Sequence, residues 1–417
     1  MKRALAALAM LAAIVPAGAV RAQECSNVVV IGLAGVTWGD VQRVQPPQIL
    51  ELAEEGAVGS VSVRTNTSRT TYASGFATIG AGARMDAPKS VGPAELGNKR
   101  ATGVRVQGVD AIRELALAAG YSTSVPGALA TTLADRPVAA IGSSALGAEP
   151  ASPVGVDVPV LLAAMDDHGL VDRAAVGGDV LEADPGSPFG VRTDLDVVEG
   201  ALRDFLDDPC SVVFLDPGDL VRADALARLG DESARDEALL SADRQIGAAA
   251  EALDRDDLLL VVTVTSPRSD DRTHLGVAIA WGTGVYPGDS LESASTRKAG
   301  LVTLPDVAPT VLQHLEIARP TSMLGRPWFG RPHLVDPVAE AVDLDEESVF
   351  SYGVQPGVAT GFVVAQVAAY VVLLALFGLR RRGRAIPAGV PATALEVVAL
   401  AVAAFPLASY LAMAGMT

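Results

Sequence analysis

The chain has 417 residues, half of them hydrophobic, and a formal net charge of −17 at pH 7. This length allows one large domain or two ordinary ones, with a sizeable buried core. Because so acidic a chain repels polyanions, nucleic acid and anionic lipid are excluded as expected partners.

Residues 1–22 have the pattern of a secretory signal. Lys2 and Arg3 precede an uncharged apolar run over residues 4–20, and Ala22 is among the small residues at which a signal peptidase would cleave. An uncleaved anchor helix is the alternative. Either one sends the domain that follows out of the cytoplasm.

Strand-like and helix-like runs alternate between residues 24 and 335, which we interpret as one extracytoplasmic domain. The expected strands cover residues 28–33, 57–63, 137–141, 211–215, 258–263 and 275–281. The expected helices cover residues 47–55, 109–119, 197–206, 236–253 and 306–315. Gly- and Pro-rich loops are expected at 142–155 and 183–190. This alternation predicts an α/β fold with a mostly parallel sheet sandwiched by helices.

The carboxyl-terminal part predicts transmembrane helices. Residues 336–356 are acidic and end in Gly and Pro, as a stalk would, and the uncharged run 358–379 is long enough to span a bilayer. The arginines that follow mark 380–396 as a cytoplasmic loop. Residues 397–417 predict a second transmembrane helix that stops without a polar flank, as in a truncated multi-span protein. The expected location is the plasma membrane, with the main domain outside.

Cys25 and Cys210 are the only cysteines, and each precedes a serine and an apolar strand. If those strands are parallel neighbours, both cysteines lie at the same end of the sheet. A disulfide between them suits an oxidising compartment. Two free buried thiols would give the same pattern.

Several motifs occur in a fixed order along the domain. They are VVVIGLAGVTW, LAEEGAVGSVSVRT, TTYASGFATIGAGAR, VVFLDPGD, SADRQIG, SASTRKAGLVTLPDVAPTVLQHL and SMLGRP. This series resembles the alkaline phosphatase superfamily, which includes phosphodiesterases, sulfatases and cofactor-independent phosphoglycerate mutases. It looks closest to a group of actinobacterial membrane proteins in which such a domain precedes several spans. The resemblance implies an alkaline-phosphatase-like fold.

Active members of that superfamily hold two divalent metals with Asp and His and use a Thr or Ser as nucleophile, because the cations offset charge in the transition state. The first-strand aspartate is Ala34 here, and the expected histidine is Leu220. The nucleophile position falls at Thr71 or Thr70, and Asp216 matches a residual metal-binding carboxylate.

Two further ligand positions are also lost. Ser266 and Pro267 stand where an Asp-His pair is expected, and residues 293–297 hold no histidine. None of the chain's four histidines falls at a position that aligns with a ligand. The resemblance therefore implies a retained fold without the metal chemistry, and no metal cofactor is expected.

An anion site is one interpretation of what remains. Thr70 or Thr71 at a helix N-terminus would offer free N–H groups to an anion, although a capping role is the alternative. Arg69, Arg268 and Arg297 are candidates to balance a phosphate, a sulfate or a carboxylated glycan. Salt bridges to nearby aspartates are the alternative for these arginines.

The sequence thus favours a pseudoenzyme of this superfamily, with a binding or scaffolding role in the cell envelope through an anionic ligand or a partner membrane protein. Two alternatives stay open. One is an active phospho- or sulfo-ester hydrolase or transferase with an atypical metal site around Asp216, Asp219 and Asp243. The other is an accessory domain of a longer membrane transporter or transferase.

Overall fold

The computed structural model describes residues 25–67, 69–88, 101–142, 158–227, 233–266, 274–333 and 336–382, together with 400 and 404. The chain divides into two compact units. The first comprises Met1–Pro267 and Gly276–Ala341, and the second comprises Arg268–Leu275 and Val342–Thr417. The expected signal at 1–22 and most of the loop at 142–155 lie outside the described residues.

An 11-stranded mixed sheet forms the centre of the first unit, in the order β13-β11-β2-β10-β9-β1-β8-β4-β5-β3, with β12 paired to β2. The strands are β1 Val28–Ala34, β2 Ala57–Ser62, β3 Ala101–Arg105, β4 Val138–Gly142, β5 Leu170–Val176, β8 Val212–Asp216, β9 Leu258–Thr265, β10 Gly276–Gly282, β11 Asp289–Ser293, β12 Leu301–Thr303 and β13 Trp328–Pro332. A separate hairpin pairs β6 Leu181–Ala183 with β7 Val191–Thr193.

The middle of the sheet is parallel. β9, β1, β8, β4 and β5 run in one direction, whereas β10 and β3 pair antiparallel to their neighbours. Every residue of β1 and β9 is buried, which explains their continuous apolar sequences, because a central parallel strand is covered on both faces. The α/β class and the mostly parallel sheet are therefore confirmed.

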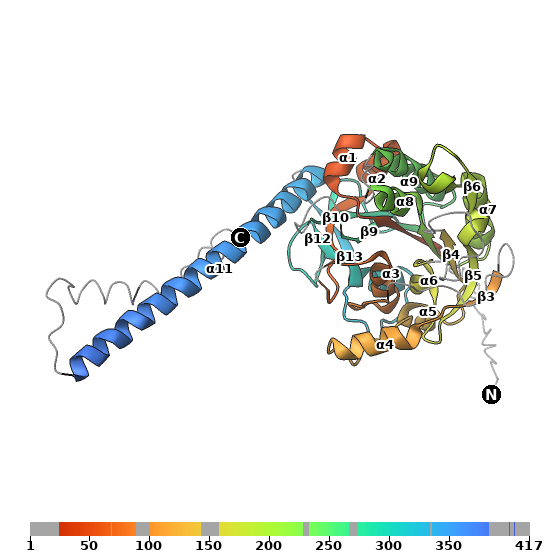
Figure 1. Ribbon diagram of the computed structural model, residues 1–417. Helices are drawn as coiled ribbons and strands as arrows, with labels where there is room; N and C mark the ends of the chain where they lie inside the picture. Colours follow the sequence, from red (N-terminus) through yellow and green to blue (C-terminus); the bar gives the residue numbers. More distant parts are fainter. Residues whose placement is uncertain are drawn as a thin grey trace, which may run out of the picture. The chain divides into compact units, whose positions relative to one another are not determined.

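Helices cover both faces of this sheet (Figure 1). Around α9 on one face pack α1, α2, α7 and α8, whereas α3, α5, α6 and α10 pack together on the other. α4 lies on the same side as α3 in Figure 1. The bounds are α1 Trp38–Val44, α2 Pro47–Glu55, α3 Tyr72–Ala81, α4 Val109–Ala118, α5 Ala128–Leu133, α6 Leu161–Ala164, α7 Leu195–Leu206, α8 Asp219–Ala227, α9 Ala234–Glu251 and α10 Val307–His314.

A disulfide joins the amino ends of β1 and β8. The Cα atoms of Cys25 and Cys210 are 5.0 Å apart, within the range that a disulfide requires. The same strand ends are also tied by Asn27, whose Oδ1 accepts the Ser211 N–H at 3.0 Å. The two cysteines thus lie at one end of the sheet, because their strands are parallel neighbours.

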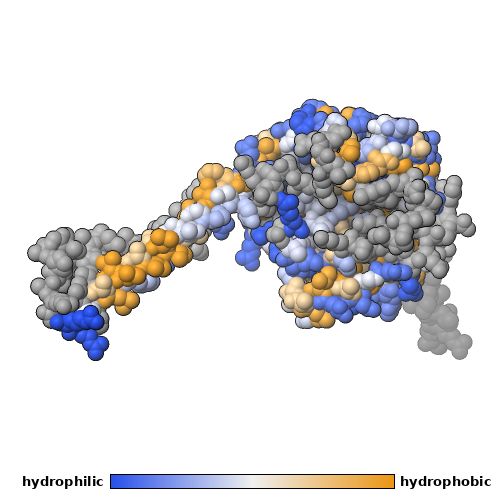
Figure 2. Space-filling model, viewed as in Figure 1, coloured by the Kyte–Doolittle hydropathy of each residue, from blue (hydrophilic) through white to orange (hydrophobic). Residues whose placement is uncertain are grey.

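One long helix, α11 (Pro337–Arg381), takes up the expected stalk and the expected first span. The stalk segment is helical because its Ala, Glu and Leu residues favour helix, and the helix continues through Pro356. Among the described residues, one helix is long and apolar enough to cross a membrane, over Pro337–Val372. Figure 2 shows its apolar surface in orange. The expected second span at 397–417 lies outside the described residues, apart from 400 and 404.

Candidate functional site

The candidate site lies at the carboxyl ends of β1, β8 and β9, where parallel α/β sheets place ligands. Ala34, the last residue of β1, is in register with Thr265 of β9. The Thr265 hydroxyl donates to the Thr70 carbonyl at 2.5 Å, and the Ser266 hydroxyl accepts the Thr70 N–H at 3.2 Å. The end of β9 therefore fixes the loop that leads into α3.

The two candidate threonines have different surroundings. Thr70 is 4% exposed; its hydroxyl donates to the Val63 carbonyl at 2.6 Å and accepts the Thr65 N–H at 3.2 Å. Thr71 is exposed and is the N-cap of α3, where its hydroxyl accepts the Ser74 N–H at 3.1 Å. Only Thr71 therefore presents its hydroxyl at the surface, and that hydroxyl already caps the helix.

α3 approaches β9 closely enough to hold this N-terminus in place. A Cβ atom at Gly75 would lie 1.9 Å from the Val264 carbonyl oxygen, so only glycine fits there. All ten residues of α3 are buried, which leaves the helix no polar face. The amphipathic pattern that reveals most surface helices is consequently missing from this segment.

The carboxylate of Asp216 is fully buried at the end of β8 and bonds to a tyrosine. The Tyr72 hydroxyl lies 2.6 Å from Asp216 Oδ1 and 2.7 Å from the Gly32 carbonyl oxygen, so its single proton lies between two acceptors. Burial and, next, the Asp216 charge raise the pKa of Tyr72 well above its ordinary value of 10.0. Tyr72 thus stays protonated and acts as a donor.

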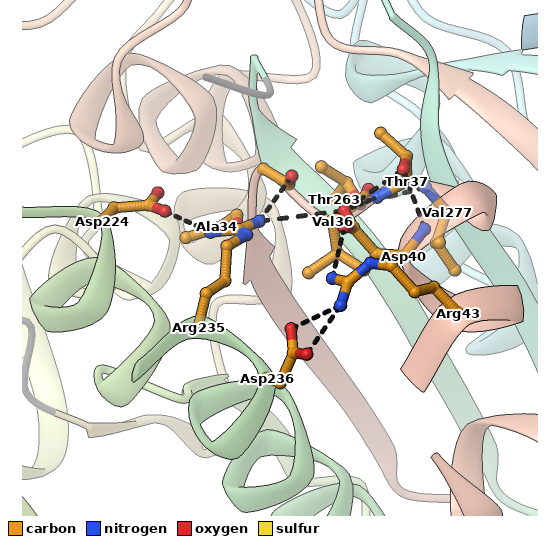
Figure 3. A network of polar contacts seen from close by, with 11 residues as sticks. Ala34, Val36, Thr37, Asp40, Arg43, Asp224, Arg235, Asp236, Thr263 and Val277 are labelled. Atoms are coloured by element: carbon orange, nitrogen blue, oxygen red, sulfur yellow. Dashed lines mark hydrogen bonds and ion pairs between the residues drawn. The ribbon is translucent and has the colours of Figure 1, made fainter. Parts of the chain in front are cut away.

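A guanidinium group occupies the carboxyl end of β1, beside Ala34 (Figure 3). Arg235, from α9, donates to the Gly35 carbonyl at 2.8 Å and to the Ala34 carbonyl at 3.3 Å. Its other terminal nitrogen pairs with the buried carboxylate of Asp224. A permanent positive charge therefore lies next to the position at which the resemblance implies a metal-binding aspartate.

Asp224 and Arg235 lie outside the motifs that carry the resemblance. Their ion pair joins α8 to α9. The spacing between the two residues matches no known motif, so the sequence gives no sign of this pairing. Only the fold brings them to the end of β1.

Asp219 and Asp243, the other carboxylates of the alternative metal site, have structural partners. Asp219 pairs with the fully buried Arg222 at 2.5 Å and accepts the Ser241 hydroxyl at 2.6 Å. Asp243 accepts the N–H groups of α2's first turn, including that of Ile49 at 2.8 Å, and burial raises its pKa. Asp219 and Asp243, two of the three carboxylates of the alternative metal site, thus already bond to groups of the protein.

The residues present do not fit a two-metal centre. No group of three or more His, Cys, Asp or Glu residues converges within the described part of the chain. The buried side chain at the expected histidine position is Leu220, and Ala34 offers only a methyl group. The carbonyl oxygens at the end of β1 bond to Arg235.

The four histidines belong to other parts of the fold. His168 is exposed beside Asp167, and His333 lies 3.6 Å from Glu340. His274 lies 2.8 Å from Asp345, which belongs with it to the second unit. His314 is half-buried in the last turn of α10, and burial lowers its pKa.

The arginine candidates are placed on separate segments. Arg69 is exposed two residues before the Thr71 cap. Arg297 is exposed in the turn after β11, with a left-handed φ of 57°, and β2 and β10 separate β11 from β9 in the sheet. Arg268 lies outside the described residues. Of the two candidate arginines in the described part of the chain, Arg69 is placed beside the candidate helix N-terminus by its position in the chain.

Comparison with known proteins finds neither a matching family model nor a matching curated protein. The chain is similar to the solved structure of a protein in the alkaline phosphatase superfamily from Vibrio parahaemolyticus, at 13% identity and TM-score 0.45, covering 73% of this chain and 69% of that one. It is similar to a 2-O GAG sulfatase at 12% identity and TM-score 0.41, covering 73% of each chain. A protein from Pyrococcus horikoshii matches at 15% identity and TM-score 0.40, over 71% of this chain and 99% of that one. At these identities and TM-scores, the similarities assign neither an activity nor a family membership.

Proposed function

We propose that this chain is a membrane-anchored pseudoenzyme whose extracytoplasmic α/β domain has a binding or scaffolding role in the cell envelope. The observation that carries the proposal is the guanidinium of Arg235 on the carbonyl oxygens of Ala34 and Gly35. A divalent cation placed there would be repelled by this permanent charge and would find no carboxylate on β1.

The remaining polar groups also support a non-catalytic role. Tyr72 donates to the Asp216 carboxylate, and Arg222 pairs with Asp219. The Thr71 hydroxyl bonds to Ser74, which is not a base that could deprotonate it. An ester would therefore meet a capped threonine instead of an activated nucleophile.

Metal content and turnover of the full chain in detergent test this proposal. After exposure to zinc or manganese and dialysis, we expect no stoichiometric metal and no hydrolysis of aryl phosphate, phosphodiester or sulfate esters. About two metals per chain, together with turnover that is lost in Thr71→Ala, would establish the alternative of an active hydrolase with an atypical metal site.

The membrane anchor rests on α11. Its apolar stretch is followed by Arg381 and Arg382, and arginines beside a span favour the cytoplasmic side. We therefore place the first unit outside the cytoplasm. Reporter fusions after residues 350 and 385 test this orientation: a periplasm-only reporter that is active at the second position would reverse it.

The ligand that we propose for the domain is an anion or a partner membrane protein. Thr71 and Arg69 lie at the exposed N-terminus of α3, where an anion would meet N–H groups. Saturable binding of phosphate or sulfate that Arg69→Ala abolishes, and that the distant Arg105→Ala leaves intact, would support the anion. Binding unaffected by Arg69→Ala, or no binding, would leave the partner protein.

A further inference from the structure

A cavity of about 460 Å³ opens at the amino ends of the central strands, the opposite end of the sheet from Thr71. Pro137 precedes β4 and Cys210 lies just before β8, so both mark that end. Its volume falls within the range of small-molecule sites. The lining residues that matter here are Ala134, Asp135, Arg136, Cys210 and Ile317.

The disulfide forms part of the wall of this cavity through Cys210. On the other sulfur, Arg136 Nη1 lies 2.5 Å from Cys25 Sγ. The two sulfur atoms thus differ in their surroundings. One belongs to a residue that lines the cavity, and the other touches a permanent positive charge, which favours a thiolate at that position.

Backbone strain is concentrated around the same cavity. Cys210 has φ 65° and Ala134 has φ 44°, both in the region that non-glycine residues rarely adopt. Glu316, next to Ile317, has φ 56°. Strain of this kind persists only where the surroundings hold it and clusters at functional sites.

The strand ends do not depend on the disulfide alone. The Asn27 N–H donates to Asp257 at 2.6 Å, and its amide donates to the Leu206 carbonyl at 3.3 Å. The Ser211 N–H in turn donates to Asn27. Reduction would therefore free Cys25 and Ser26 while β1 and β8 stay paired.

We propose that Cys25–Cys210 is an exchange-active disulfide that reacts with an extracytoplasmic thiol. The incoming thiolate attacks Cys210 Sγ from the cavity, an S–S bond to Cys210 forms, and the Cys25–Cys210 bond breaks. The electron pair leaves on Cys25 as a thiolate beside Arg136. Attack of that thiolate on Cys210 regenerates the disulfide and releases the thiol. Attack by a second thiol on the partner's sulfur instead leaves two reduced cysteines and an oxidised partner.

Glutathione is the probe for the test. The native full chain in detergent is incubated with millimolar glutathione without denaturant, quenched with iodoacetamide and mapped by mass spectrometry. We expect a glutathione adduct on Cys210 and alkylation of Cys25. A disulfide that opens only in denaturant, or an adduct on Cys25, would overturn the proposal.

Variants of Arg136 test the role of its charge. Arg136→Ala should slow adduct formation by roughly 1.5- to fivefold, the range that one partly exposed ion pair supplies. Arg136→Lys, which keeps the charge, should retain most of the rate and guards against a folding defect in the alanine variant. Arg105→Ala is the matched control and should react at the original rate. Equal rates in all three variants would contradict the mechanism.

Discussion

At the carboxyl ends of the central strands the buried charges are paired with one another, whereas at the amino ends a disulfide and an arginine line a cavity. Arg235 with Asp224 and Tyr72 with Asp216 occupy the first end. Cys210 and Arg136 belong to the second. At the carboxyl ends, where the resemblance implies catalysis, the polar side chains thus bond to one another. The disulfide that we propose to be reactive lies at the amino ends, where the resemblance implies no catalysis.

The largest effect is expected from Arg235→Ala at the carboxyl end. It removes the guanidinium from Asp224, whose side chain is 5% exposed, and should lower the free energy of unfolding by about 2–3 kcal/mol. Arg43→Ala is the control, since Arg43 is 52% exposed and its ion pairs should contribute less than about 1 kcal/mol. Chemical denaturation of both variants measures the difference. Equal losses would mean that the Arg235 pair is an ordinary surface contact.

The next largest effect is expected from Tyr72→Phe, which should lower the free energy of unfolding by about 1–3 kcal/mol. It removes the hydroxyl that donates to the buried Asp216 carboxylate. Tyr286→Phe, at a residue 67% exposed, should change stability little. The same denaturation experiment compares the pair. A Tyr72→Phe protein as stable as the parent would show that Asp216 does not need this donor.

Alanine variants of the two threonines before α3 should lose different amounts of stability, and the difference between them should be smaller than the effects above. Thr70→Ala leaves the Thr65 N–H and the Val63 carbonyl without their partner and should cost about 2 kcal/mol. Thr71→Ala removes a cap and should cost about 1 kcal/mol. Thermal unfolding of both variants checks the order. The reverse order would place the structural threonine at 71.

The smallest effect concerns His314 and pH. Burial lowers its pKa from the ordinary 6.5, against an opposing effect of the Asp257 charge. The unfolded chain then binds the proton more readily than the folded chain does. The stability contributed by neutral His314 is therefore fully present above pH 6.5 and is lost as pH falls toward the folded pKa. His314→Gln should therefore unfold with a weaker pH dependence than the parent over that window. Identical slopes for His314→Gln and the parent would exclude His314 as the source.

Sequence patterns predicted β1, β4, β8, β9 and α2 well, whereas the parallel strand β5 was missed. The apolar run beginning at Val28 and the helix that starts at Pro47 and ends before Gly56 carry local signals that tertiary contacts do not override. The short strands β3, β11, β12 and β13 were missed because three to five residues rarely establish an alternation.

The candidate site was predicted only in part. Ala34, Asp216 and Thr71 could be assigned from motif positions, since each follows or begins a recognisable element. Arg235 and Tyr72 act through contacts between distant segments, and neither has a spacing rule that sequence could reveal. Fully paired sites are hard to recognise for this reason.

The central position of β1 has a consequence for the order in which the domain can form. Among the strands that the structure describes, β1 is the first to be synthesised, yet it pairs with β8 and β9, and Asn27 bonds to Asp257 at a separation of 230 residues. During synthesis, the apolar segment from Val28 therefore precedes most of the domain, and both of its partner strands follow much later. Such long-range pairing folds slowly and leaves the waiting strand open to aggregation. A nascent chain that stops short of Leu258 lacks a partner for one whole side of its first strand, so protection by a chaperone matters most in that interval.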